Sequence, residues 1–368
     1  MGLFASMKRA AIVTALGLTV VAQLSPLSAG AADTVTLTGA GSTFDSPLFT
    51  KAFSEYTKSV NPNVQVNYGG GGSGAGISQL TDKTVDFGAT DGPMTDEQLT
   101  TAGGPTAILH VPVTLGAVAV IYNLAGVKAP LNLDGDAIAK IFDGSIQKWN
   151  DDAIKALNPG VDLPGTLIAI VHRSDGSGTT NIFTTYLSTA NADWSKKIGA
   201  ANSVKWPSGL GQKGSDGVAG AVKMFDGAIG YVELAYATQN SIPFANIKNS
   251  SGAFVAPSAA GATACAAALA DKLPADFRVK IAGCTGADAA IYPISGYSWI
   301  IMRTDQSDAA KGAALVNLVY WLIHDGQKFG TDLSYAPLPA AVVEKASAAL
   351  ATVTSGGQPL LTATPAAS

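Results

Sequence analysis

The sequence predicts an α/β protein with mostly parallel sheets, and three observations support this fold class. A strand, a turn rich in Gly, Ser and Thr, and a helix follow one another three times along the chain, which is the order typical of α/β folds. Hydrophobic residues make up 47% of the 368 residues and charged residues only 14%, so the chain can bury large cores. Its length is enough for two lobes of ordinary size.

Residues 1–31 are predicted to be a secretory signal peptide. A positively charged start precedes a short apolar run over 10–22, and small residues at 29–31 favour cleavage before Ala32. The apolar run is too short to span a membrane. Cleavage would leave 337 residues, 368 less 31, and would change the formal net charge from −4 to −6, because two basic residues and no acidic ones are lost. A net negative protein is not suited to hold nucleic acid by its general field.

The first strand–turn–helix unit starts with a strand at 35–38. It continues through a turn at 39–44 into a helix at about 46–60, where aromatic residues recur at helical spacing. The other predicted strands lie at 64–68, 85–89, 111–122, 228–232 and 298–302. The other predicted helices lie at 77–81, from the end of the 172–180 turn to about 198, and at about 309–328. Residues 250–271 are predicted to form a loose loop with a short helix, and 352–368 a frayed tail.

The three turns, at 39–44, 69–76 and 172–180, are the candidate binding elements. A helix start leaves about four amides unpaired and carries partial positive charge, so it suits an anion. A single such turn is usually ordinary helix capping. Four consecutive glycines at 69–72, and the recurrence of the turn, favour a ligand instead. None of the turns carries a nucleotide-binding signature.

Charged residues beside these turns define the anion further. Arg173 offers a bidentate fork for an oxyanion, and Asp175 is expected to hold that fork in place. Asp91 closes the run that follows the strand at 85–89. An ionised Asp only accepts hydrogen bonds, so it favours an anion that carries a proton, such as hydrogen phosphate, over sulfate. The alternative is that Asp91 is a surface turn residue.

The two cysteines, Cys265 and Cys284, are an even pair in an exported chain. A disulfide is the expected arrangement, and two buried free thiols are the alternative. Without histidines nearby they do not make a zinc site. We expect no metal and no cofactor.

These residues resemble a known family, the periplasmic phosphate-binding protein of the high-affinity phosphate ABC importer (the PstS family). The matching segments run in order through nearly all of the mature chain. They are GAGSTF (39–44), GGSGAG (71–76), VDFGATD (85–91), WNDDAIKALNPG (149–160), HRSDGSGTT (172–180), KWPSGLGQKGSDG (205–217), AIGYVELAYA (228–237) and LSYAPLP (333–339).

The resemblance implies a two-lobe periplasmic binding protein (a type II-like Venus flytrap) with phosphate buried in the inter-lobe cleft. It implies a discontinuous lobe I at 32–115 plus 292–368 and a lobe II at 116–291. The implied phosphate-binding residues are Thr43, Phe44 through its amide, Ser73, Asp91, Arg173, Ser177, Gly178 and Thr179. Asp175 would support Arg173.

The resemblance also implies a monomeric, non-catalytic, periplasmic protein. It would deliver inorganic phosphate, and arsenate if that anion is admitted, to the membrane permease subunits of an ABC importer. Two features depart from the family. Asp45 stands where relatives often have proline, and would place a carboxylate at the lip of the cleft unless it points away. Residues 250–291, with both cysteines, match no family segment and are interpreted as a local elaboration of lobe II.

The sequence leaves four alternative functions open. A serine hydrolase needs a G-x-S-x-G elbow, which Ser73 and Ser177 both fail to provide. A metal-dependent phosphatase needs clustered ligands, whereas Asp151 and Asp152 look like a helix cap. A sulfate or molybdate binder conflicts with Asp91. An adhesive or surface role would show phosphate binding without an importer partner.

Overall fold

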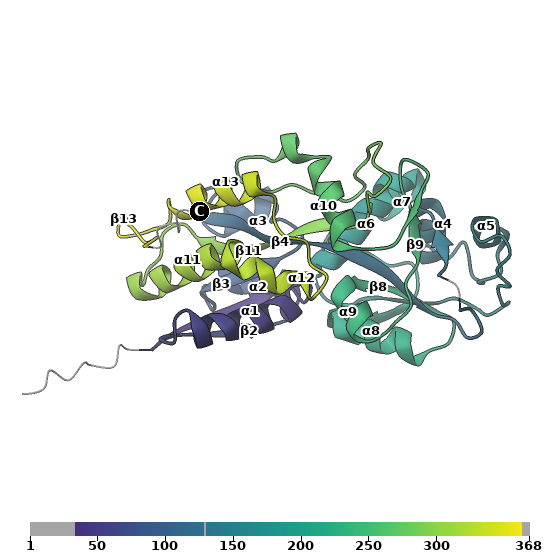
Figure 1. The fold of residues 1–368 in the computed structure, drawn as a ribbon, viewed down its shortest axis with the longest axis horizontal. Helices are drawn as coiled ribbons and strands as arrows, with labels where there is room; N and C mark the ends of the chain where they lie inside the picture. The colour runs from purple at the N-terminus through teal and green to yellow at the C-terminus, as the bar shows by residue number, and fades with distance from the viewer. Residues whose placement is uncertain (1–33, 129, 363–368) are drawn as a thin grey trace, which may run out of the picture. The chain divides into compact units, whose positions relative to one another are not determined.

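The protein is described here by a computed structural model covering residues 34–128 and 130–362. The predicted signal peptide and its cleavage point lie outside these residues. An eight-stranded sheet runs through the described chain in the order β2-β1-β3-β11-β4-β8-β6-β7. Figure 1 shows the long strand β4 within it. Two smaller sheets, β10-β9-β5 and β12-β13, accompany it.

The strands of the large sheet are β1 (Val35–Gly41), β2 (Val64–Gly69), β3 (Phe87–Thr90), β4 (Ile108–Asn123), β6 (Ala169–Arg173), β7 (Leu210–Gln212), β8 (Ala228–Glu233) and β11 (Ser295–Arg303). The short strands are β5 (Asn132–Leu133), β9 (Asn246–Lys248), β10 (Phe254–Val255), β12 (Thr354–Ser355) and β13 (Gln358–Pro359).

The helices of the first half are α1 (Ser46–Ser59), α2 (Ser73–Thr81), α3 (Asp96–Thr101), α4 (Gly135–Phe142), α5 (Asp152–Leu157), α6 (Gly178–Ala190) and α7 (Ala192–Lys197). Those of the second half are α8 (Gly214–Met224), α9 (Leu234–Gln239), α10 (Ala259–Ala267), α11 (Ala309–Ile323), α12 (Lys328–Thr331) and α13 (Ala340–Leu350), with 3-10 turns η1 (Ala270–Lys272) and η2 (Asp325–Gln327).

The large sheet is mixed, because its outer and central pairs differ in direction. The pairs β1–β2, β1–β3, β6–β8 and β6–β7 are parallel, as expected for strands joined through helices. The three central pairs β3–β11, β11–β4 and β4–β8 are antiparallel. The prediction of mostly parallel sheets therefore holds only for the outer pairs.

Strand β4 connects the two halves of the sheet. Its residues 108–117 pair with β11, and residues 118–123 pair with β8. The register between β4 and β11 shifts next to Ser298, opposite the segment that contains Pro112. Such an irregularity re-aims side chains locally, and Ser298 points its hydroxyl into the polar site described below.

Two predicted helices are wrong in extent. The helix expected to follow the 172–180 turn and run to about 198 is interrupted at Asn191, which ends α6 and caps α7 by accepting a hydrogen bond from the Trp194 amide. The helix expected at 309–328 ends at Ile323, because His324 leaves helical geometry (φ −113°, ψ −101°) and the 3-10 turn η2 follows.

The predicted frayed tail is wrong for the described part, 352–362. Strands β12 and β13 form a hairpin there. Val353 is fully buried, and the Leu360 amide donates a hydrogen bond to the Val353 carbonyl at 3.1 Å. Apolar side chains from this tail thus pack on the core, which tail composition alone does not indicate.

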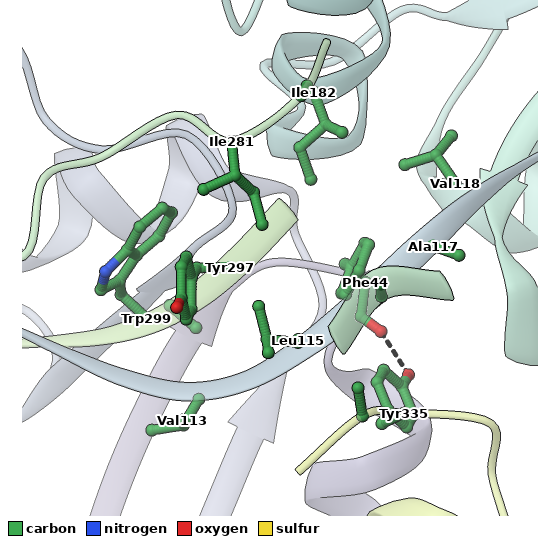
Figure 2. Packing of buried hydrophobic residues seen from close by; sticks show 14 of the residues in the cluster. Phe44, Val113, Leu115, Ala117, Val118, Ile182, Ile281, Tyr297, Trp299 and Tyr335 are labelled. Carbon is green, nitrogen blue, oxygen red and sulfur yellow. Dashed lines mark hydrogen bonds between the residues drawn. The ribbon is translucent and has the colours of Figure 1, made fainter. Parts of the chain in front are cut away.

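The main hydrophobic core surrounds β4 and β11 and reaches the turn after β1. Phe44 is fully buried there, and Tyr335 donates a hydrogen bond from its hydroxyl to the Phe44 carbonyl at 2.5 Å (Figure 2). Gly116 on β4 lies under the Phe44 ring, where a Cβ would come within 2.4 Å of it. The residues that begin α1 are therefore held by close packing against the sheet.

The segment 250–291 carries the expected disulfide. Cys265 on α10 is joined to Cys284, and both side chains are buried. The short helix predicted in 250–271 is α10. Nothing in the described part of the chain forms a helix long and apolar enough to cross a membrane.

Replacing both cysteines with alanine is expected to lower the free energy of unfolding by about 3 kcal/mol, since the bond closes a loop of 19 residues in the unfolded chain. Denaturant unfolding of the oxidised parent and of Cys265→Ala/Cys284→Ala measures the difference. The reduced parent is the matched control and should resemble the double variant. A decrease in the free energy of unfolding of less than about 1 kcal/mol would contradict the expected stabilisation by the disulfide.

Candidate functional site

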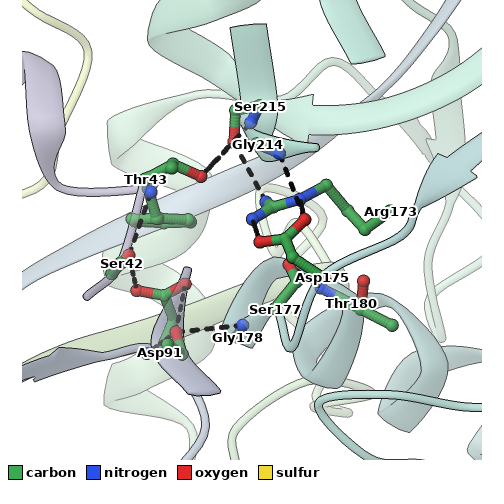
Figure 3. A network of polar contacts seen from close by, with 12 residues as sticks. Ser42, Thr43, Asp91, Arg173, Asp175, Ser177, Gly178, Thr180, Gly214 and Ser215 are labelled. Carbon is green, nitrogen blue, oxygen red and sulfur yellow. Dashed lines mark hydrogen bonds and ion pairs between the residues drawn. The ribbon is translucent and has the colours of Figure 1, made fainter. Parts of the chain in front are cut away.

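Three helix N-termini and the turn after β1 meet in one polar cluster (Figure 3). The Gly178 amide, at the start of α6, donates to Ser73 Oγ at the start of α2 (3.0 Å). The Gly214 amide, at the start of α8, donates to Asp175 Oδ1 (3.1 Å). Because each helix start carries partial positive charge, their convergence favours an anion.

Glycine is required where the α2 and α6 turns touch. Gly72 has φ +91°, and a Cβ there would lie 2.2 Å from Asp175 Oδ2. The Gly74 amide donates to the Gly176 carbonyl at 2.8 Å. The glycine-rich turn at 69–76 thus allows the two backbones to approach closely.

Asp91 lies at the centre of this cluster, just beyond the end of β3, and its residue surface is only 3% exposed. Its Oδ1 accepts hydrogen bonds from the Ser42 hydroxyl and from the Ser298 hydroxyl (2.8 Å). Its Oδ2 faces the Ser73 hydroxyl at 3.4 Å, and its own amide donates to Ser73 Oγ at 3.2 Å. The alternative that Asp91 is a surface turn residue is wrong.

Burial raises the pKa of Asp91 from 3.8 to about 6, while hydrogen bonds from Ser42 and Ser298, the charge of Arg173 and the Ser73 hydroxyl limit the rise. At neutral pH the carboxyl is therefore ionised. An ionised carboxylate only accepts hydrogen bonds, so Asp91 presents an acceptor within a cluster of donors.

Arg173, the last residue of β6, forms the expected ion pair with Asp175. Its Nε donates to Asp175 Oδ1 at 2.8 Å and its Nη2 to Oδ2 at 2.5 Å. Burial opposes ionisation of Asp175, but the hydrogen bonds and charge of Arg173 outweigh it and hold the pKa of that carboxyl below its usual range. This pairing fixes the plane of the guanidinium and leaves Nη1 directed at Ser215 Oγ, 3.4 Å away.

Thr43 and Phe44 occupy the turn between β1 and α1. Thr43 Oγ1 lies 3.0 Å from Ser215 Oγ and accepts from the Ser215 amide at 3.2 Å. The Phe44 amide, predicted as a ligand donor, donates to Ser42 Oγ at 2.9 Å. The Tyr236 hydroxyl donates to the Thr43 carbonyl at 2.6 Å, so this turn contacts α8 and α9 directly.

The remaining predicted residues are at the start of α6. Ser177 accepts a hydrogen bond from the Thr180 amide at 3.0 Å and so acts as the N-cap. Gly178 contacts Ser73, as above. Thr179 follows in the first turn and is 1% exposed. The structure therefore brings all eight predicted ligand residues, together with Asp175, to adjoining turns.

Asp45 does not lie at the lip of a cleft. It is fully buried, and its Oδ2 lies 2.5 Å from the Ser298 hydroxyl, the same hydroxyl that contacts Asp91. Burial, and then the neighbouring Asp91 charge, raise the pKa of Asp45 well above its usual range. The expectation of a carboxylate that hinders anion entry is corrected by this inward orientation.

Sequence reasoning missed three serines of the cluster: Ser42, Ser215 and Ser298. Ser42 stands next to Thr43 in the first turn, and Ser215 follows Gly214 in a further Gly/Ser turn at a helix start, so both had a local signal. Ser298 sits in an apolar strand and had none, because its role depends on the register of β11 with β3 and β4.

Histidine and acidic residues outside the cluster have structural roles. His110 is buried and accepts from the Met94 amide at 3.2 Å. Asp151 caps α5, as predicted, through the Ala153 amide. Across residues 34–128 and 130–362, no three His, Cys, Asp or Glu side chains gather in an arrangement that could hold a metal ion.

Comparison with known proteins identifies the family of the chain. Residues 27–323 match the family model of the PBP superfamily domain. The chain is 41% identical over 325 residues to the phosphate-binding protein PstS of Xylella fastidiosa (strain 9a5c), covering 88% of this chain and 87% of the relative. It is 39% identical over 314 residues to PstS of Pasteurella multocida, covering 85% and 89%. The chain therefore belongs to the PBP superfamily and, within it, to the PstS family of phosphate-binding proteins.

Solved structures agree on the fold. A high affinity periplasmic phosphate-binding protein (PfluDING), solved with phosphate bound, superposes with a TM-score of 0.66 at 22% identity and covers 86% of this chain and 93% of its own. A phosphate binding protein from Stenotrophomonas maltophilia superposes with a TM-score of 0.65 at 20% identity, covering 90% and 100%. The α/β binding-protein fold predicted from the sequence is confirmed.

The raised pKa of Asp91 makes a prediction about stability. An acid whose native pKa is raised stabilises the folded state fully below its unfolded pKa and loses that contribution as the pH rises through its native pKa. Asp91→Asn should therefore gain stability relative to the parent between about pH 4 and pH 7, by up to about 3 kcal/mol for a shift from 3.8 to about 6.

Urea unfolding in phosphate-free buffer across this pH range provides the measurement, because a bound ligand would add its own stabilisation. Asp152→Asn, which removes a carboxylate whose side chain is 99% exposed, is the matched control. If the free energy of unfolding changed with pH in the same way for the parent and for Asp91→Asn, the raised pKa of Asp91 would be contradicted.

Proposed function

We propose that this protein binds hydrogen phosphate in the polar cluster around Asp91 and delivers it, outside the cytoplasm, to a membrane ABC importer. Relatives at about 40% identity are named as phosphate-binding proteins. One observation carries the proposal: a buried, ionised acceptor, Asp91, lies among hydroxyl and amide donors and one guanidinium.

The donors supply attraction for an oxyanion. Arg173 gives a fixed positive charge held by Asp175, and the amides at the starts of α2 and α6 give partial positive charge. Because these groups are preorganised by packing, little ordering remains to be done when an anion enters. Alone, they would accept sulfate as readily as phosphate.

Asp91 supplies the discrimination. Hydrogen phosphate carries a proton that it can donate to the carboxylate, whereas sulfate at neutral pH carries none and would meet an unpaired, repelling charge. Leaving a buried acceptor unpaired costs about 1–3 kcal/mol, and more for a charged group. Arsenate carries the same proton, so this chemistry admits it.

The proposed contact residues are those predicted from the sequence, with one addition. They are Thr43, Phe44 through its amide, Ser73, Asp91, Arg173, Ser177, Gly178 and Thr179, supported by Asp175. Ser215 joins them in the proposal, because its hydroxyl lies within 3.4 Å of Arg173 Nη1 and 3.0 Å of Thr43 Oγ1.

The lobes are proposed to divide at β4, with lobe I at 32–115 plus 292–368 and lobe II at 116–291. The change of β4's partner from β11 to β8 between Ala117 and Val118 supports a boundary there. Hydrogen bonds that would cross between the lobes include Gly178 to Ser73 and Ser215 to Thr43. Opening would separate these pairs, and closure around phosphate would signal occupancy to the permease.

The proposed setting follows from the same reasoning. A signal peptide at 1–31 would direct the chain to the periplasm, where it would act as a monomer and contact the permease subunits of the importer. The role is capture and delivery, not catalysis.

A calorimetric titration of phosphate-stripped mature protein near pH 8 tests the function. Phosphate is expected to bind tightly with one-to-one stoichiometry, and sulfate to give no binding heat, because only the first anion can donate to Asp91. Asp91→Asn should reduce the difference in affinity between phosphate and sulfate, because the amide offers a hydrogen-bond donor in place of a repelling charge. A parent that binds sulfate as tightly as phosphate would overturn the ligand assignment, and heat from neither anion would overturn the function.

Arg173→Ala should weaken phosphate binding by at least about 1.5–3 kcal/mol, the range for a hydrogen bond to a charged group. Arg173→Lys is the matched variant, because it keeps the charge but loses the fork that pairs with Asp175. Thermal unfolding of each variant checks that the site is still assembled. Unchanged affinity in folded Arg173→Ala would remove Arg173 from the site.

A further inference from the structure

Asp45 is a buried acid for which neither the fold nor the proposed contacts account. It sits at the N-cap position of α1, where an aspartate usually accepts hydrogen bonds from the first helical amides. Here the side chain makes no such cap. It turns inward instead, with Oδ2 2.5 Å from Ser298 Oγ and with no hydrogen-bond donor for Oδ1 among the described residues.

Ser298 contacts three acceptors but has only one hydroxyl proton. Its Oγ lies 2.5 Å from Asp45 Oδ2, 2.8 Å from Asp91 Oδ1 and 3.3 Å from the Thr90 carbonyl. Two ionised carboxylates cannot both accept that proton. One of them must itself carry a proton and donate it to the serine oxygen.

The surroundings decide which carboxyl is the acid. Asp91 faces the hydroxyls of Ser42, Ser73 and Ser298, and the charge of Arg173 lowers its pKa. Asp45 is fully buried, and among the described residues its carboxyl group has Ser298 as its one hydrogen-bond partner. A carboxylate with one oxygen unpartnered is far more costly to bury than a neutral acid.

Other titratable groups around Asp45 reinforce this assignment. The charges that influence Asp45 and its neighbours come from acids and phenols on β2, on β8, just after β3 and in the segment before α13. These groups are Asp91, Glu233, Tyr68 and Tyr335. None of the four is a cation at any pH. The start of α1 does favour an anion, but that attraction is weaker than the burial of an unpaired charge beside Asp91.

We propose that Asp45 and Asp91 share one proton through Ser298, with Asp45 as the neutral acid and Asp91 as the carboxylate. Asp45 Oδ2–H donates to Ser298 Oγ, and the Ser298 hydroxyl donates to Asp91 Oδ1. Asp45 is thus a positioning residue that fixes the direction of the serine proton. This arrangement keeps Asp91 an acceptor, which is the property that selects an anion carrying a proton. The effect on selectivity rests on the proposed function, whereas the placement of the proton does not.

Carbon-13 NMR of protein labelled at aspartate carboxyl carbons tests the placement without any ligand. At pH 7.5 the signal lost in Asp45→Asn should have the chemical shift of a protonated acid, and the signal lost in Asp91→Asn that of a carboxylate. The signal lost in Asp152→Asn, from a fully exposed group, gives the carboxylate reference. A carboxylate shift for Asp45, or an acid shift for Asp91, would overturn the proposal.

The pH profile of phosphate affinity tests the consequence for the site. Affinity should fall on the acid side as Asp91 takes up a proton. If Asp45 is neutral, Asp45→Asn removes no charge, and the midpoint of this fall should not move to lower pH. If Asp45 were ionised, its removal would relieve repulsion and lower the midpoint by about one pH unit or more. That downward movement would contradict the proposal.

Ser298→Ala provides a second variant should Asp45→Asn fail to fold. Because Ser298 is inferred to donate to the Asp91 anion, its loss should raise the pKa of Asp91 and move the acid midpoint to higher pH. A movement to lower pH would mean that Asp91 donates to Ser298, which is the reverse direction. If the NMR result holds but no variant and no parent binds phosphate, the proton placement stands and the proposed function fails.

Discussion

The buried charge of Asp91 is the constraint on which the rest of the site depends. A carboxylate removed from water needs hydrogen-bond donors, and here three serine hydroxyls supply them. Those serines come from β1's turn, from α2 and from β11, so stabilising one charge ties together elements that are far apart in sequence. Burial still raises the pKa of Asp91 to about 6. At neutral pH the carboxyl therefore remains ionised and can accept a hydrogen bond from a protonated ligand.

Charge balance around Asp91 follows a simple division of roles. In the proposed function, Arg173 and the helix starts attract the anion. Asp175 pairs with Arg173 and holds the orientation of its guanidinium. Asp45 stays neutral in our proposal and so avoids a second negative charge beside Asp91. A site that must attract an anion and still keep one carboxylate can do so only if its other acids are paired or protonated.

The main contribution of the fold to the site is to bring the backbones of separate turns close together. The backbone of the α2 turn touches that of the α6 turn through Gly74 and Gly176, and a Cβ on either glycine would lie 3.1 Å from the Cα of the other. Strand β4 passes through the whole sheet and changes partner midway. Strand β11, which carries Ser298, pairs with the first part of β4, and strand β8 pairs with the second part. In the proposed function, a rotation at this change of partner would open or close the cluster.

Local patterns in the sequence determined much of this protein: the strand–turn–helix units, the Arg173–Asp175 pair and the disulfide between Cys265 and Cys284. The strand–turn–helix units, the ion pair and the capping of α5 by Asp151 depend on residues that are close in the chain. The disulfide was predicted from the even number of cysteines. The ends of helices near 191 and 324, the packing of the 352–362 hairpin, and the roles of Asp45 and Ser298 were decided only by tertiary structure. The physical reason is that burial and strand register set the partners of a side chain, and both arise from contacts between residues as distant as Asp45 and Ser298.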